Sequence, residues 1–121
     1  MSSNKTSGAV CDLKEKHCKP CEGGIDPHSP ATSREMMKQL HGDWKLSADS
    51  KKIRRDYKFK NFYRTMSFTN AVAHIANTED HHPDLEVGYG NLSITYTTHA
   101  INGLSDNDFI CAAKIDSLPL E

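Results

Sequence analysis

The stretch "DHHPDLEVGYGNLSITYTTH", residues 80–99, determines most of what can be predicted about the fold. Apolar side chains alternate with polar ones in residues 85–89 and again in residues 92–96. Alternation with a period of two is typical of a strand that buries one face. Gly90-Asn91 separates the two runs, so the pattern predicts a β-hairpin, followed by a polar stripe that ends at His99.

A helix is predicted immediately before this stretch, from Phe62 to about Asn77. Apolar residues recur there at spacings of three and four, as expected for an amphipathic helix. Asn61 stands where an N-cap is expected. Upstream of it, alternating residues at 44–46 and 53–59, joined by the polar turn "SADSKK", predict a further hairpin.

Two further helices are predicted nearer the ends of the sequence. Thr32, with Glu35 three residues later, forms a capping-box pattern, and Gly42 would end the helix that it opens. Ser105, with Asp108 three residues later, predicts the start of a last helix. The order is then α-β-β-α-β-β-α, which favours an α+β fold: a four-stranded antiparallel sheet with its helices packed on one face.

The first 29 residues are rich in Ser, Lys, Gly and Pro, which predicts a flexible N-terminal arm before a domain at residues 30–121. The arm contains Cys18-Lys19-Pro20-Cys21, a C-x-x-C pattern. A zinc site usually needs two such pairs, so this one is only a weak indication of metal or redox chemistry. We interpret it as an incidental pair of reduced thiols.

Composition excludes several classes of function. At 121 residues the chain predicts one domain, and its net charge of −1, without a long block of like charge, excludes a stand-alone nucleic-acid binder. No run of 18 apolar residues and no apolar leader segment occurs, so neither a membrane span nor a signal peptide is predicted. Four cysteines without such a leader predict reduced thiols and a cytoplasmic location.

The candidate chemistry lies in five polar residues: Asp80, His81, His82, His99 and Asp108. Histidine titrates near neutral pH, so several imidazoles around one pocket can donate and accept protons there. Pro83 restricts the residues before it to extended or turn conformations at the helix exit, where side chains can point into a cleft. The combination therefore favours an acid–base site.

Each of these residues also has an ordinary structural explanation. Adjacent histidines suit an exposed turn, a histidine at a strand end suits the surface, and Asp108 can simply cap its own helix. A three-histidine metal site is a further chemical possibility, because imidazole binds zinc and iron. The sequence has no H-x-x-x-H or H-E-x-x-H pattern, and no motif for acyl transfer, NTP hydrolysis or dinucleotide binding.

Residues 79–116, "EDHHPDLEVGYGNLSITYTTHAINGLSDNDFICAAKID", resemble the signature of the pterin-4a-carbinolamine dehydratase family. That signature has an acidic residue before His-His-Pro, "ITxxTH" on a strand, and "GLSxxD" opening the last helix. Residues 57–76, "YKFKNFYRTMSFTNAVAHIA", resemble the strand-to-helix passage of the family. The likeness covers residues 32–116, and the cysteine-bearing arm resembles bacterial members.

The resemblance implies a hydro-lyase that converts 4a-hydroxytetrahydropterins, such as 4a-hydroxytetrahydrobiopterin, to quinonoid dihydropterin and water. This step recycles the cofactor of aromatic amino-acid hydroxylases. By position, His81, His82 and His99 would surround the 4a-hydroxyl and the neighbouring ring nitrogen. Asp108 would orient a histidine. The residues that would line the pocket are Asp80, Pro83, Tyr89 and Thr98.

The resemblance also carries expectations about cofactors and partners. No metal or organic cofactor is needed, because the pterin is itself the substrate. A homodimer or homotetramer is expected, with a functional link to a phenylalanine hydroxylase, and neither nucleic acid nor membrane as a partner. Many relatives carry an aromatic residue soon after His-His-Pro, where this chain has Asp84-Leu85. The alternative function is a non-enzymatic binding or regulatory module for a hydroxylase or a transcription factor.

Overall fold

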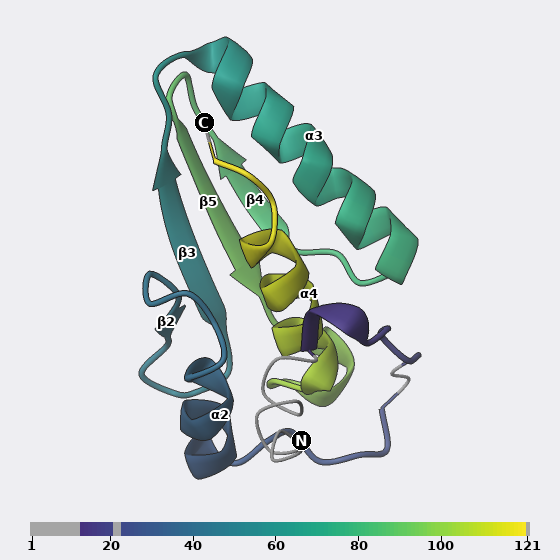
Figure 1. The fold of residues 1–121 in the computed structure, drawn as a ribbon. Coiled ribbons are helices and arrows are strands. Elements are labelled where there is room, and N and C mark those ends of the chain that lie inside the picture. Colours follow the sequence, from purple (N-terminus) through teal and green to yellow (C-terminus); the bar gives the residue numbers. More distant parts are fainter. Residues whose placement is uncertain (1–12, 21–22, 121) are drawn as a thin grey trace, which may run out of the picture.

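The computed structural model describes residues 13–20 and 23–120. Its helices and strands, in chain order, are η1 (Leu13–Glu15), α2 (Pro30–Met37), β2 (Lys45–Leu46), β3 (Ile53–Lys58), α3 (Phe62–Glu79), β4 (Asp84–Val87), β5 (Asn91–Tyr96), η2 (His99–Ile101) and α4 (Asp106–Asp116). The predicted α+β class and the order α-β-β-α-β-β-α are confirmed, with the two short 3-10 turns η1 and η2 added (Figure 1).

All neighbouring strands of the sheet are antiparallel, in the order β2-β3-β5-β4. Both predicted hairpins are present, and they join through the central pair, in which Ile53 lies opposite Tyr96. Along β3 every second side chain is buried and the others are exposed. One face of the sheet is therefore covered, and Figure 1 shows α3 and α4 running alongside the sheet.

Helix α3 begins where the sequence predicts. The Asn61 side-chain oxygen accepts a hydrogen bond from the Arg64 backbone N–H at 2.9 Å, which satisfies one free donor of the first turn. The helix ends at Glu79, two residues beyond the predicted end. Asp80 then adopts a left-handed backbone conformation with φ 55°, and the His81 N–H donates to the Ala76 carbonyl at 3.1 Å. This left-handed turn ends the helix immediately before the two adjacent histidines.

Helix α2 differs from the prediction at both ends. It begins at Pro30, and its N-cap is Ser29, whose hydroxyl oxygen accepts from the Thr32 N–H at 3.1 Å. Proline fits the first helical position because its missing N–H would have no partner there. The predicted cap at Thr32 is therefore wrong, and the helix ends at Met37, well before Gly42.

The sequence predicts a flexible arm over residues 1–29, of which residues 1–12 and 21–22 lie outside the described residues. Residues 13–20, however, pack against the domain. Leu13 is 4% exposed and belongs to the hydrophobic core, because it is the apolar side chain of η1 that faces α4. The Lys114 ammonium also donates to the Lys14 carbonyl at 2.7 Å. Within the described part of the chain, no helix combines the length and the apolar character needed to cross a bilayer.

Candidate active site

A cleft of about 540 Å³ lies where the end of α3, the end of β5 and the start of α4 meet. Its lining comes from residues 18–20, 79–82, 97–100 and Asn107. Five of the eight predicted site residues line it: Asp80, His81, His82, Thr98 and His99. The turn after α3 and the turn after β5 thus bring the three candidate histidines into one cleft, although seventeen positions separate His82 from His99.

The other three predicted site residues do not line the cleft. Asp108 lies behind it and contacts His81, and Pro83 leads from His82 into β4. Tyr89 is 70% exposed in the turn between β4 and β5, where its ring stacks on Phe62 with centroids 6.5 Å apart. Strand β4 ends at Val87, so the alternation that included Tyr89 stops before it. Tyr89 therefore does not line this cleft, and its role in substrate binding stays a prediction.

His81 and Asp108 form the best-defined pair of the site. The His81 Nε2 lies 2.6 Å from Asp108 Oδ1, and the Asp108 side chain is 0% exposed. An ionised carboxylate only accepts hydrogen bonds, so Nε2 carries the proton of this contact. The ring of His81 also stacks on Tyr96, with centroids 5.3 Å apart and an interplanar angle of 11°. These contacts hold the imidazole in one orientation.

The second carboxylate oxygen of Asp108 organises the start of α4. It accepts a hydrogen bond from the Ser105 backbone N–H at 2.9 Å and one from the Thr98 hydroxyl at 2.7 Å. Thr98 and Ser105 also share a hydrogen bond between their hydroxyls at 2.8 Å. Asp108 therefore caps its own helix and also contacts His81, which are the two explanations that the sequence leaves open for it.

The electrostatics of this pair affect the charge of His81. Burial on its own would lower the pKa of His81, because it disfavours the charged ring. The hydrogen bond to Asp108 and the negative charge of that carboxylate act in the opposite direction, and together they raise the pKa of His81 above its usual value. His81 is thus more often a cation at neutral pH than a free histidine.

The raised pKa of His81 predicts how stability depends on pH. The folded state holds this proton more tightly than the unfolded state, so its contribution is fully present below the unfolded pKa of about 6.5. It is lost as the pH rises through the folded pKa of His81. We expect the free energy of unfolding, measured with urea between pH 6 and 9, to fall with a slope of at most about 1.4 kcal/mol per pH unit.

The matched control for this pH dependence is Asp108→Asn, which removes the charge that holds the proton. Its unfolding free energy should be flatter over the same pH range. Equal slopes in the two proteins would contradict the assignment to His81.

His82 and His99 are both exposed to the cleft. His82 Nε2 lies 3.1 Å from the side-chain oxygen of Asn77, one turn back on α3. His99 opens η2 and does not end a strand as predicted, because β5 stops at Tyr96 and Thr98 forms an isolated bridge with Gly103. Within the described residues, the His99 ring has no hydrogen-bond partner. Both rings are therefore accessible to a ligand in the cleft.

The lining of the cleft also contains residues that the sequence did not suggest. Glu79 is buried; one of its oxygens accepts from the Cys18 N–H at 2.7 Å, and the other lies 2.9 Å from His17 Nδ1. Burial would raise the pKa of Glu79, but the hydrogen bonds from Cys18 and His17 outweigh it and lower the pKa below its usual value. Glu79 is the first acidic residue of the quoted family signature, which is the only signal that could have indicated it.

Two further residues of the lining, Lys19 and Asn107, are joined by a reciprocal pair of hydrogen bonds. The Lys19 N–H donates to the Asn107 side-chain oxygen at 3.0 Å, and the Asn107 amide donates to the Lys19 carbonyl at 2.7 Å. The two residues are 88 positions apart, so no local pattern could predict their contact. No group of three or more His, Cys, Asp or Glu side chains among the described residues is arranged to hold a metal ion.

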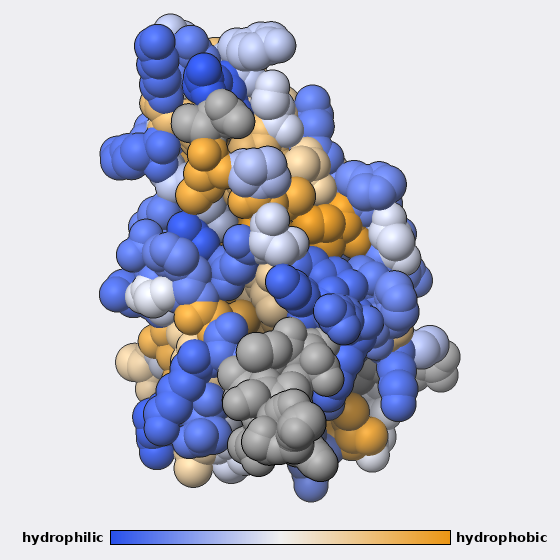
Figure 2. Space-filling model, viewed as in Figure 1, coloured by the Kyte–Doolittle hydropathy of each residue, from blue (hydrophilic) through white to orange (hydrophobic). Residues whose placement is uncertain are grey.

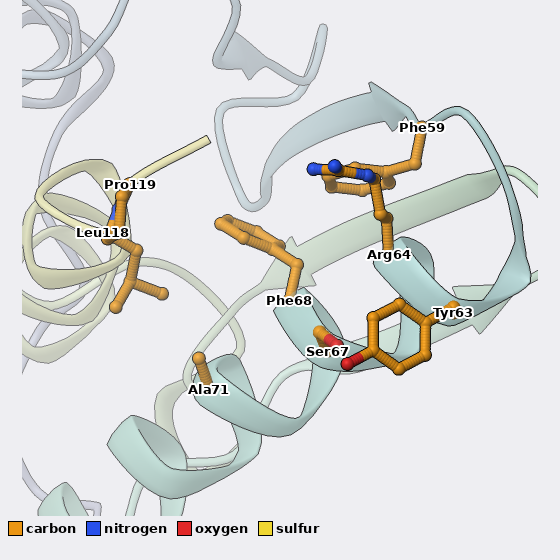
Figure 3. A pocket seen from close by; sticks show the side chains of 8 residues that line it. All are labelled: Phe59, Tyr63, Arg64, Ser67, Phe68, Ala71, Leu118 and Pro119. Atoms are coloured by element: carbon orange, nitrogen blue, oxygen red, sulfur yellow. The ribbon is translucent and has the colours of Figure 1, made fainter. Parts of the chain in front are cut away.

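A second cavity, of about 300 Å³, lies between α3 and the C-terminal segment (Figure 3). Figure 2 shows apolar side chains gathered on this face of the molecule. Phe59, Phe68 and Leu118 line the cavity, and Arg64 is the only side chain of its lining that is charged at neutral pH. It contains neither an imidazole nor a carboxylate, so the cleft with the three histidines is the candidate site for proton chemistry.

A family model and the curated relatives that match this chain carry the same family description. A family model described as pterin 4 alpha carbinolamine dehydratase matches residues 26–118. A relative from Nitrosomonas eutropha, named "Putative pterin-4-alpha-carbinolamine dehydratase", is 54% identical over 109 residues, which cover 90% of this chain and 95% of the relative. A relative of the same name from Legionella pneumophila (strain Corby) is 51% identical over 107 residues, covering 88% of this chain and 95% of the relative.

Solved structures share the fold. One, described as a transcriptional coactivator/pterin dehydratase from Brucella melitensis, superposes with a TM-score of 0.71 at 27% identity, covering 76% of this chain and 97% of that one. Another, described as a pterin dehydratase-like protein that is a RuBisCO assembly factor in the alpha-carboxysome, has a TM-score of 0.55 at 19% identity. The match covers 64% of this chain and 89% of the chain in that structure. At 19% identity, the likeness shows the fold alone.

Proposed function

Since the chain belongs to the pterin-4-alpha-carbinolamine dehydratase family, we propose that it dehydrates 4a-hydroxytetrahydropterin to quinonoid dihydropterin by histidine acid–base catalysis. The observation that supports this mechanism is the cleft shared by His81, His82 and His99. Positioned imidazoles typically contribute on the order of 10²–10⁴-fold to proton transfers of this kind.

The proposed reaction moves two protons at adjacent atoms of the pterin. One histidine donates a proton to the 4a-hydroxyl, so that the C–O bond breaks and the hydroxyl leaves as water. The neighbouring ring nitrogen shares its lone pair with that carbon to form the C=N bond, and a second histidine removes the N–H proton. His82 and His99 suit these two roles, because both rings are exposed to the cleft.

His81 has a different role in this proposal. Its Nε2 proton is held by Asp108 at 2.6 Å, so this nitrogen is not free to exchange protons with a substrate. As a cation at the cleft wall, the ring would stabilise the partial negative charge that builds up on the departing oxygen before the proton from the general acid is fully transferred to it. Asp108 is then a positioning residue that acts through His81, while Asp80 and Thr98 shape the cleft around the substrate.

The remaining parts of the proposal come from the family. We infer a homodimer or homotetramer in the cytoplasm that recycles the tetrahydropterin of an aromatic amino-acid hydroxylase, such as a phenylalanine hydroxylase. No cofactor is included, because the pterin is the substrate and the histidines supply the proton transfers.

The direct test uses freshly generated 4a-carbinolamine. The purified protein is expected to accelerate its conversion to quinonoid dihydropterin, followed by absorbance against the uncatalysed rate. Treatment with EDTA beforehand should leave the rate unchanged. A rate equal to the uncatalysed one would contradict the proposal, and a rate lost with EDTA and restored by zinc or iron would favour the metal site instead.

A non-enzymatic role is the second candidate, since the similar Brucella melitensis protein is described as a transcriptional coactivator as well as a dehydratase. A binding module for a transcription factor or a hydroxylase would not need the histidines of the cleft. In cells, the His82→Ala and His99→Ala variants would then keep their function. If the chain acts as a dehydratase, both variants lose it.

A further inference from the structure

Two free cysteines from distant parts of the chain meet next to the cleft. Cys18 Sγ lies 3.6 Å from Cys111 Sγ, although 93 positions separate the two residues. We propose that this pair is a redox-modification site, which hydrogen peroxide oxidises to a disulfide that links the N-terminal arm to α4. The proposal concerns a site beyond the proposed dehydratase function and does not depend on it.

The two sulfur atoms are close enough to form a disulfide after a small movement. A disulfide has a sulfur–sulfur distance of about 2.0 Å, so the two sulfurs must approach by roughly 1.6 Å. Cys111 is fully buried in α4 and fixed by the helix. Cys18 lies outside any helix or strand, so a small shift of its backbone can supply the approach.

The surroundings favour the reactive form of the pair. The hydrogen bond with Cys111 and burial raise the pKa of Cys18 far above its usual value, so Cys18 holds its proton and Cys111 is the sulfur that can be a thiolate. The hydrogen bond from the Cys18 thiol lowers the pKa of Cys111 despite its burial, and the positive charge of His81 acts in the same direction. The thiolate is the nucleophilic form of cysteine.

Access favours Cys18 as the first sulfur to react. Cys18 lines the cleft and is half-buried, whereas Cys111 is shielded behind it. As the Cys18 sulfur attacks one oxygen of the peroxide, its proton passes across the 3.6 Å contact to the Cys111 thiolate. The O–O bond breaks, and Cys18 sulfenic acid and hydroxide form; the proton that Cys111 had lost to solvent converts this hydroxide to water. The Cys111 sulfur then attacks the Cys18 sulfur, the S–O bond breaks, and hydroxide leaves and takes up the thiol proton. Two thiols and one peroxide thus give one disulfide and two waters.

The disulfide would fix one wall of the cleft. In the reduced protein, hydrogen bonds hold that wall, from Cys18 to Glu79 and between Lys19 and Asn107. These bonds can open together when the arm moves, whereas a covalent link to α4 cannot. The disulfide also closes a loop that spans 93 positions. Closing so long a loop removes much conformational entropy from the unfolded state, which stabilises the folded protein.

A disulfide between Cys18 and Cys21 is the competing product, because these two residues form the C-x-x-C pattern.

The test treats the full-length chain with hydrogen peroxide, alkylates the remaining thiols and digests the protein with trypsin without reduction. Mass spectrometry should find the peptide of residues 17–34 linked to that of residues 65–114. The matched variants are Cys21→Ser, which should keep this link, and Cys18→Ser, which should lose it.

Thermal unfolding gives a second readout on the same variants. Oxidised Cys21→Ser should unfold roughly 5–15 °C above its reduced form, and Cys18→Ser should show no such shift. The proposal is overturned if the linked peptides disappear in Cys21→Ser. It is equally overturned if the oxidation of Cys18 ends at sulfinic acid, or if both thiols are still free to be alkylated after peroxide treatment.

Discussion

Replacing His82 or His99 with alanine is expected to lower the rate of carbinolamine dehydration by a factor on the order of 10²–10⁴. Each variant removes one of the two exposed imidazoles that can reach a ligand in the cleft. Because both side chains are exposed, the free energy of unfolding should change by no more than about 0.5 kcal/mol. The loss of rate can therefore be separated from a loss of fold by measuring urea unfolding on the same samples.

The pH profile distinguishes the two roles. Loss of the general base should remove the acidic limb of the rate profile, and loss of the general acid should remove the alkaline limb. The matched control is His74→Ala, since His74 is an exposed histidine of α3 that does not line the cleft. Wild-type rates in both His82→Ala and His99→Ala would refute the acid–base assignment.

Asp108→Asn is expected to have the largest effect on stability, lowering the free energy of unfolding by about 3 kcal/mol. The Asp108 carboxylate is completely buried and accepts hydrogen bonds from His81, Thr98 and the Ser105 N–H. An asparagine has only one acceptor oxygen, so in either orientation its amide faces a donor and leaves it unsatisfied. The dehydration rate should fall as well, because His81 loses its orientation and its raised pKa.

Asp106→Asn is the control for this experiment, on the same turn of the same helix. The Asp106 side chain is 66% exposed and lies 2.8 Å from His28 Nε2, so its loss should cost no more than about 0.5 kcal/mol. Urea unfolding of the two variants at pH 7 measures the difference directly. Similar losses in both would mean that the buried pair contributes no more than a surface contact.

Much of the fold could be predicted because its signals are local. The Asn61 cap, the apolar spacing of α3 and the alternation along β5 each lie within a few residues of the structure that they specify. The same patterns do not specify where an element stops. Ser29 and Thr32 are both good N-caps, and only the proline after Ser29 decides between them. Alternation likewise continues to Tyr89 in the sequence, although pairing ends at Val87.

The site was less predictable than the fold. Spacing alone left each histidine with an ordinary explanation, and the family resemblance brought His81, His82 and His99 together. The contacts of Glu79 with the arm and of Cys18 with Cys111 join residues 61 and 93 positions apart. Such contacts depend on how the helices dock, which no short pattern records.

The position of Asp108 after all the histidines has a consequence for protein synthesis. A chain translated up to residue 104 already contains all seven histidines, but it lacks α4 and the carboxylate that orients His81. The nascent protein therefore carries its imidazoles without a working arrangement of them. On the ribosome, the proposed acid–base arrangement should form only when the last helix has left the exit tunnel and docked against the rest of the domain.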